Sequence, residues 1–340
     1  MHIFIDETGS FSGFQLPSTL SLVGALIIPS TRLRSLEREY RRLRPSLPMS
    51  NGEVKGRLLS EDHVAKLIPI LHHHGALFEA VGIDMSVHSE SGLLRWQVNQ
   101  ADLITASLTV YHDEKVRDQI SGFRTQFENF KLPLMVQSYL TFALIQNILE
   151  LAPMFFSQRR PEELKEFHWI IDAKGDAGIP TDWEQWWVQF ILPVIQSRTL
   201  IAPTQAIPVG DYSFMKRFEI PLTQFLRKHR RSKDTGAPAM NLEMILGEHL
   251  KFSKDPEPGI ELVDIITNAT RRALIGHLKA SGYRDIPTLM IHRNPAPYIK
   301  MVSLLETPVP PRTYAYTAVL QEFGERGRNM STPRTTSHYW

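Results

Sequence analysis

The chain has 340 residues, of which 42% are hydrophobic, enough to bury one large core or two smaller ones. Lysine and arginine number 38 against 36 for aspartate and glutamate, so the overall charge does not indicate a polyanionic partner. The absence of cysteine excludes disulfides, thiolate metal sites and a cysteine nucleophile. With no secretory leader before the first predicted strand, and an apolar run at 20–28 that is too short to cross a bilayer, we expect a cytoplasmic protein.

The first nine residues predict a strand that ends on two acids. Ile3, Phe4 and Ile5 form a short apolar run that is typical of a strand covered on both faces. Asp6 and Glu7 follow at its carboxyl end, before a Thr-Gly-Ser turn. Ionised carboxylates beside a buried strand are unfavourable unless a cation compensates them, and the expected cation is a divalent metal ion.

Residues 20–44 predict a second strand and a first helix. Leu20–Ile28 is rich in valine, isoleucine and leucine, which favours a buried strand. The helix begins at Ser30 or Thr31 and stops before Pro45. Its arginines form either a solvated face or a contact for a phosphate backbone; they are Arg32, Arg34, Arg38, Arg41, Arg42 and Arg44.

A further acid lies in the short element Glu53-Val-Lys55, before a predicted helix over 60–74. That helix opens with acidic residues, which the helix dipole favours there, and it ends in three consecutive histidines. Adjacent helical positions point in different directions, and histidine suits a helix C-terminus, so we interpret 72–74 as a helix end rather than a metal site. The alternating segment 80–87 predicts a third strand.

Helical periods with few turn signals extend from 93 to 157 and predict a helical insertion. The apolar run Phe-His-Trp-Ile-Ile-Asp over 167–172 then predicts a fourth strand. This strand also ends on a carboxylate, Asp172, before a glycine-bearing loop. Two strands that each end on an acid are typical of an active site at the strand ends of an open sheet.

Three features follow between 181 and 233. Thr181 or Asp182 caps a helix whose tryptophans recur at helical spacing, which predicts core packing. The segment 199–209 predicts a fifth strand, at an edge because it contains two prolines. The basic stretch 225–233 either meets a polyanion or is simply solvated.

Helical spacing returns over 260–272 and places Asp264 at the margin of the apolar face. Glu261 and Asn268 stand three residues before and four residues after it, on the same side of the helix. The last fifty residues contain many prolines and little periodicity. Beyond Phe323 we expect a disordered or partner-dependent tail.

Asp6, Asp172 and Asp264 are remote in sequence but fall at comparable places, two strand ends and the first turns of a late helix. Such carboxylate clusters suit Mg²⁺ or Mn²⁺. Two ions about 3.5–4 Å apart would activate a water and stabilise the leaving oxygen of a phosphodiester. Asp6, on the central strand, is the candidate to bridge the two ions, and Glu53 is a candidate further ligand.

Four segments of the chain resemble the bacterial domain-of-unknown-function 3800 family. They are Phe-Ile-Asp-Glu-Thr-Gly, Glu53-Val-Lys55, Ile-Ile-Asp172 and Ser253-Lys-x-x-x-Pro-Gly-Ile-Glu-Leu-Val-Asp264. The sequence differs mildly from the family pattern, with threonine for serine at 8, glutamate for glutamine at 261 and valine for alanine at 263. None of these differences removes a carboxylate.

The resemblance implies a ribonuclease H-like α/β fold, a mixed five-stranded sheet with helices on both faces and an acidic site where the first and fourth strands meet. On this basis residues 1–290 form the ribonuclease H-like domain, with the insertion at about 93–157, and 291–340 form a partly disordered C-terminal extension. Carried over by position, the metal-binding acids are Asp6, Glu53, Asp172 and Asp264. Lys55 approaches the scissile phosphate or pairs with Glu7, whose role as ligand or structural partner stays open.

The sequence therefore predicts a nuclease that uses Mg²⁺ or Mn²⁺, with two ions expected, to hydrolyse RNA or DNA. Its resemblance points to a role in bacterial defence. The alternative is a catalytically silent ribonuclease H-like module that binds nucleic acid or a protein. That alternative would use the helical insertion, which could also mediate a homo-oligomer. A small-nucleotide or sugar-phosphate hydrolase is less favoured, because the sequence has no glycine-rich phosphate loop.

Overall fold

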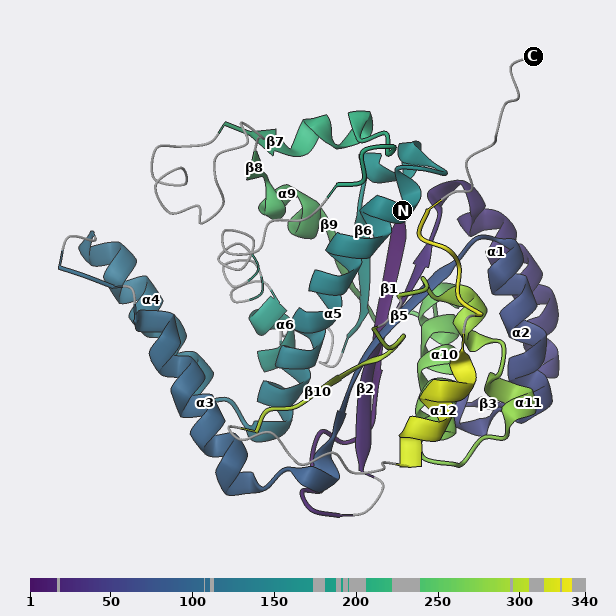
Figure 1. The fold of residues 1–340 in the computed structure, drawn as a ribbon, viewed down its shortest axis with the longest axis horizontal. Helices are drawn as coiled ribbons and strands as arrows, with labels where there is room; N and C mark the ends of the chain where they lie inside the picture. Colours follow the sequence, from purple (N-terminus) through teal and green to yellow (C-terminus); the bar gives the residue numbers. More distant parts are fainter. Residues whose placement is uncertain are drawn as a thin grey trace.

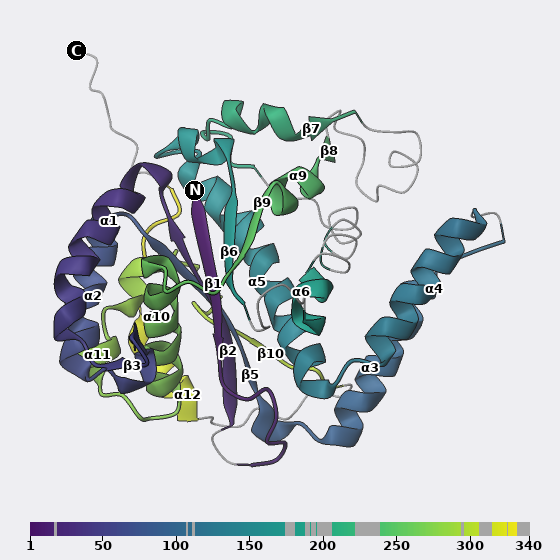
Figure 2. The ribbon, with the colours of Figure 1, turned by 180° about the vertical axis from the view of Figure 1, so that it is seen from behind.

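A central sheet of six strands stands between two layers of helices in the computed structural model (Figures 1 and 2). The structure describes residues 1–16, 19–106, 108–110, 113–173, 181–187, 191, 195, 206–221, 239–293, 296–305, 315–324 and 326–331. The strand order is β10-β5-β2-β1-β6-β9. The bounds of these strands are β1 His2–Thr8, β2 Leu20–Ile28, β5 Leu77–Asp84, β6 His168–Asp172, β9 His249–Ser253 and β10 Lys300–Val302.

The sheet is mixed. Strand β1 pairs antiparallel with β2 and parallel with β6, and β2 pairs antiparallel with β5. The outer pairs β6 with β9 and β5 with β10 are parallel. Because β1, β6 and β9 run in the same direction, their carboxyl ends meet at one edge of the sheet.

Strand β1 contributes to the hydrophobic core on both sides of the sheet. Ile3 and Ile5 belong to one cluster of buried side chains, and Phe4 belongs to the other. This alternation is the period of two that an extended strand imposes on its side chains. It places Asp6 on the face of Phe4 and Glu7 on the face of Ile5.

One face of the sheet is covered by five helices, of which α10 contacts β1 and β2 directly (Figure 2). They are α1 Ser30–Leu43, α2 Glu61–His73, α10 Pro258–Leu274, α11 Ala280–Tyr283 and α12 Ala315–Phe323. The predicted N-terminus of α1 is right, but neither Ser30 nor Thr31 caps it. Instead the carboxylate of Glu163 accepts hydrogen bonds from the amides of Ser30 and Thr31, at 2.6 and 3.3 Å.

The opposite face is covered by α5, Leu132–Phe156, which packs on β2 and β5. This helix is long and apolar enough to cross a membrane, but 72% of its most apolar stretch is buried inside the molecule, as in the core helix of a soluble protein. The other α-helices of the described residues are α3 Glu90–Thr105, α4 Glu114–Glu128, α6 Asp182–Trp186 and α9 Leu242–Gly247. Their other strands form two short pairs, β3 Met49–Ser50 with β4 Glu53–Val54 and β7 Glu219–Ile220 with β8 Ala239–Met240.

The predicted segment 93–157 contains two kinds of helix. Helices α3 and α4 extend away from the body as an arm (Figure 1). Helix α5 instead forms a large part of the core, with buried residues along its whole length. The 291–340 segment likewise contains β10 of the central sheet and α12, which packs against α10.

Four of the five predicted strands are present, and the third of them starts at Leu77 and ends at Asp84, earlier than expected. The five-stranded sheet was wrong, because β10 adds a sixth strand. The predicted strand at 199–209 lies outside the described residues up to 205, and 206–209 are not in a strand. The basic stretch 225–233 and the end of the tail, 332–340, also lie outside them. The neighbour of β6 is β9, whose alternating polar residues concealed it.

The contact between α10 and β1 leaves no room at Gly259, where an added Cβ would lie 2.2 Å from the ring of buried Phe4. We expect Gly259→Ala to lower the free energy of unfolding by about 1–3 kcal/mol through overpacking. At the exposed Gly247 of α9 nothing lies within 4 Å of an added Cβ. There the same substitution should leave stability unchanged or raise it by up to about 1 kcal/mol. Urea unfolding measures the free energy of unfolding of both variants. Equal changes in the two would contradict the close packing of α10 on β1.

Candidate metal centre

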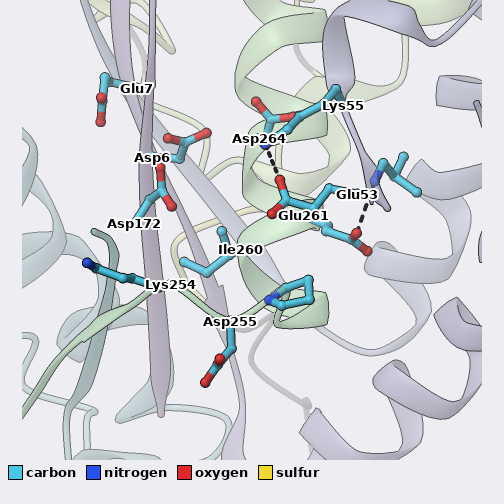
Figure 3. A pocket seen from close by; sticks show the side chains of 12 residues that line it. Asp6, Glu7, Glu53, Lys55, Asp172, Lys254, Asp255, Ile260, Glu261 and Asp264 are labelled. Atoms are coloured by element: carbon cyan, nitrogen blue, oxygen red, sulfur yellow. Dashed lines mark hydrogen bonds and ion pairs between the residues drawn. The ribbon is translucent and has the colours of Figure 1, made fainter. Parts of the chain in front are cut away.

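A pocket of about 220 Å³ opens at the carboxyl ends of β1 and β6, beside the N-terminal half of α10 (Figure 3). It brings together all the residues that the sequence singled out for chemistry. The lining residues are Asp6, Glu7, Glu53, Val54, Lys55, Asp172, Lys254, Asp255, Pro256, Ile260, Glu261 and Asp264.

Asp6 and Asp172 are placed side by side by the strand register. Ile5 of β1 pairs with Ile171 of β6, so the next residue of each parallel strand points to the same face. Asp6 is buried, with 6% of its surface exposed, whereas Asp172 is half-buried. The two acids that end separate strands therefore share one side of the pocket.

Asp264 reaches the same point from α10. Its carboxyl group lies within hydrogen-bonding distance of the carboxyl group of Asp6. Its Oδ2 accepts a hydrogen bond of 2.7 Å from the amide of Gly56, and its Oδ1 accepts one of 2.6 Å from Asn268. Burial raises the pKa of Asp264, an effect that the hydrogen bonds with the Gly56 amide and with Asp6, and the charge of nearby Lys55, only partly offset. A proton or a metal ion between the two carboxyl groups would relieve their repulsion.

Gly56 fixes the loop of Glu53 against α10. A Cβ added at Gly56 would lie 2.7 Å from the Cα of Ile265 and 2.8 Å from the carbonyl oxygen of Asp264, so only glycine allows this approach. The same close contact brings the Gly56 amide to the Asp264 carboxylate. The glycine after Lys55 thus has both a packing role and a hydrogen-bonding role.

The end of β1 is tied to α10 by a second link. The hydroxyl of Thr8 donates a 2.9 Å hydrogen bond to Oδ1 of Asn268, whose amide group donates to Asp264. Gly9 then turns the chain out of the strand at φ +110°, a region that other residues rarely adopt. The sequence analysis placed Asn268 on the side of Asp264, and the structure adds its contact with Thr8.

Glu53 and Lys55 form an ion pair at the rim of the pocket (Figure 3). Their side chains are 35% and 42% exposed, respectively. The hydrogen bond that Lys55 donates to Glu53 raises the pKa of Lys55, and the charges of Asp264 and Asp172 act in the same direction. Glu53 is therefore the most peripheral of the four predicted ligands, and it would exchange its lysine partner for a metal ion.

Glu7 and Glu261 line the same pocket but differ from the three aspartates. Figure 3 shows Glu7 on the opposite side of β1 from Asp6, as the alternation of the strand requires. Glu261 is buried and fully engaged: it accepts two hydrogen bonds from Arg44, at 2.7 and 2.6 Å, and one each from Tyr40 and the Val54 amide. Glu261 thus holds α1 and the 53–56 loop onto α10.

These residues fit a hard divalent cation. Their donors are carboxylate oxygens, the preferred ligands of Mg²⁺ and Mn²⁺. The buried Asp6 and Asp264 carboxyls are in contact, and the four predicted acids outnumber Lys55. An excess of negative charge in a half-buried pocket favours a bound cation.

The histidine run lies at the C-terminal end of α2, as predicted. His72 and His73 are exposed, and buried His74 contacts Ser35 at 3.3 Å and Glu39 at 2.8 Å. The sequence analysis missed a different group, in which Glu166, His168 and His249 lie close together. No motif spacing could indicate it, because the register of β6 with β9 alone brings these histidines together.

We expect Glu261→Ala to lower the free energy of unfolding by about 3 kcal/mol, because it leaves the Val54 amide and the partly buried Arg44 without their acceptor. Affinity for Mn²⁺, measured by calorimetry on the folded variant, should change little. The control is Glu243→Ala, which alters an exposed glutamate of α9. A loss of Mn²⁺ affinity without a loss of stability would instead identify Glu261 as a ligand.

Comparisons with known proteins found no relative of this chain. The chain matches no protein-family model, no curated protein and no solved structure.

Proposed function

We propose that this protein is a metal-dependent nuclease that hydrolyses phosphodiester bonds of RNA or DNA. The observation that carries the proposal is the convergence of Asp6, Asp172 and Asp264 on one pocket from three remote segments of the chain. Each acid alone has an ordinary structural explanation. Three carboxylates that share an open pocket, two of them in contact, have a clear function as ligands of divalent cations.

The protein groups have distinct roles in this mechanism. Asp6 lies between the other two aspartates and is the residue suited to bridge two cations, while Asp172 and Asp264 flank it. Bound Mg²⁺ or Mn²⁺ would supply an activated water and stabilise charge on the leaving oxygen. Lys55, on the rim and near Asp264 and Asp172, supplies a positive charge for a non-bridging phosphate oxygen. Gly56 and Asn268 hold Asp264 in place.

The fold supports the same proposal. A ribonuclease H-like protein is expected to carry its acids where the first and fourth strands meet, with helices on both faces of the sheet. Here β1 lies beside β6, the fourth of the long strands; Asp6 lies two residues before the end of β1, and Asp172 ends β6. All four segments that resemble the domain-of-unknown-function 3800 family contribute to the pocket. We therefore extend the proposal to that fold and family, and to a cytoplasmic role in bacterial defence.

The surroundings of the pocket suit a polyanionic substrate. Lys254 is exposed and lines the same pocket as Lys55 and the acids. On α1 the six arginines do not form one face: Arg44 turns inward to Glu261, and the other five carry exposed or partly exposed side chains. Those exposed arginines are candidates for phosphate contacts away from the pocket.

A second candidate function is binding without catalysis. The arm of α3 and α4 extends from the body and exposes Leu94, Val98, Leu103 and Val116. Such apolar side chains on a projecting hairpin favour a protein partner or a second copy of the chain. Calorimetry separates the two functions, since a silent module would bind nucleic acid but no divalent cation at millimolar concentration.

The purified chain should cleave labelled RNA or DNA in Mg²⁺ or Mn²⁺. Asp6→Ala and Asp264→Ala should each lower the rate by about a hundredfold or more, because each removes a ligand of the catalytic cations. Asp118→Asn, which changes an exposed acid of α4, is the matched control and should retain full activity. Cleavage that survives both alanine variants would refute the assignment.

The raised pKa of Asp264 predicts a pH dependence with a definite sign. Protons compete with cations for this carboxyl, so activity at limiting Mg²⁺ should rise with pH over a range above that of an ordinary aspartate. Saturating Mg²⁺ should shift the acidic limb of the pH–activity profile to lower pH. A limb that stays in place at every Mg²⁺ concentration would contradict competition at this site.

In metal-free buffer the raised pKa of Asp264 also makes the free energy of unfolding depend on pH. Because the folded state raises the pKa, protonated Asp264 stabilises the fold below its unfolded pKa, and this contribution is lost as pH rises through the folded pKa. Asp264→Asn replaces this carboxyl group by a neutral amide, which no longer has to be ionised in a buried setting. We therefore expect this inactive variant to be more stable than the wild type at neutral pH without metal, by on the order of 1 kcal/mol. Thermal unfolding in EDTA measures the difference.

A further inference from the structure

Three histidines form a ladder across the amino ends of β1, β6 and β9. His2 pairs in register with His168, and His168 pairs with His249. The rings of His2 and His168 stack at 4.5 Å and 8°, and those of His168 and His249 stack at 4.4 Å and 17°. Parallel strands in register place equivalent side chains on one face, so the three rings are held nearly parallel.

Glu166 completes a group of possible ligands at this ladder. Its Oε2 lies 3.2 Å from Nε2 of His168, while Lys165 approaches its other oxygen at 3.8 Å. One ligand atom from each of Glu166, His168 and His249 lies within 4.8 Å of the other two. All three side chains are half-buried. Two imidazoles and a carboxylate, partly shielded from water, are the ligand types of zinc sites.

The ladder is separate from the carboxylate pocket. His2 and Asp6 lie on the same face of β1, as do His168 and Asp172 of β6, because each pair is four residues apart. Four residues of extended strand span about 13 Å. Phe4 and other apolar side chains of the sheet fill the space between, so neither group of ligands can reach an ion at the other.

We propose that Glu166, His168 and His249 bind a borderline transition-metal ion of the Zn²⁺ class, at a second site distinct from the carboxylate pocket. Imidazole nitrogen favours Zn²⁺, Co²⁺ and Ni²⁺ over Mg²⁺, whereas the all-oxygen pocket favours Mg²⁺ and Mn²⁺. The two sites therefore select different ions. Three protein ligands leave a fourth coordination position for water.

Binding requires the stacked imidazoles of His168 and His249 to rotate, because a metal ion lies in the plane of each ring that ligates it. Metal–ligand bonds of about 2.0–2.1 Å place tetrahedral ligand atoms about 3.3 Å apart, so atoms now within 4.8 Å must approach by about 1.5 Å. The side chains of His168 and Glu166 are 27% and 37% exposed, which leaves them room to rotate. His2, stacked on the outer side of His168, limits the movement of that ring and directs it toward His249.

A Co²⁺ titration of the full chain tests this site. Excess Mg²⁺ occupies the carboxylate pocket, and the visible absorption of four- or five-coordinate Co²⁺ then reports on nitrogen ligands, with Zn²⁺ competition giving the affinity. His249→Ala and Glu166→Gln should each weaken binding at least tenfold. Thermal unfolding verifies that both variants are folded; Glu166→Gln keeps a hydrogen-bonding group beside His168.

The matched control is the double variant His72→Ala/His73→Ala, which removes the exposed histidines at the end of α2. It should bind Co²⁺ and Zn²⁺ as the wild type does. Loss of binding in this control, unchanged binding in both His249→Ala and Glu166→Gln, or absence of the Co²⁺ spectrum in the wild type would overturn the second site. None of these outcomes bears on the nuclease proposal, which concerns different residues.

Discussion

The contact between the carboxyl groups of Asp6 and Asp264 is the constraint on which the rest of the site depends. Two carboxylates at hydrogen-bonding distance in a buried setting repel each other unless a proton or cation lies between them. A fold that needed only a stable core would gain by replacing one of them with an apolar residue. The fold instead keeps both acids in the pocket, and in the proposed nuclease a divalent cation would convert their repulsion into a favourable interaction.

Helix α10 is fixed to the sheet by contacts that do not themselves bind metal. Glu261 and Arg44 join it to the first helix, and the Gly56 amide joins it to the loop of Glu53. On the side of the strand, Thr8 reaches Asn268. Because these links surround Asp264 on three sides, the helix cannot withdraw from β1 to relieve the repulsion. Their combined effect is to hold Asp264 close to Asp6, as the proposed cation site requires.

The sequence alone predicted those elements of this protein that a local residue pattern marks. Apolar runs predicted β1, β2 and β6, and the acids at their ends predicted the pocket, since the carboxyl ends of parallel neighbours must meet. It failed for β9, which is polar on alternate residues, and for β10, which is only three residues long. Both are defined by the strands beside them. The sequence could not predict the role of Glu261, because the ion pair with Arg44 depends on how α1 packs against α10.

The same limit explains why the histidine ladder was not predicted. Asp6 and Asp172 each follow an apolar strand, so each is conspicuous alone, whereas His168 and His249 are ordinary residues until β6 and β9 pair in register. The parallel pairing that assembles acids at the carboxyl edge must also align whatever stands four residues earlier at the amino edge. One strand register therefore produces two groups of ligands on a single face, oxygen donors at one end and nitrogen donors at the other. Their ligand chemistry, rather than their position, gives them different metal preferences.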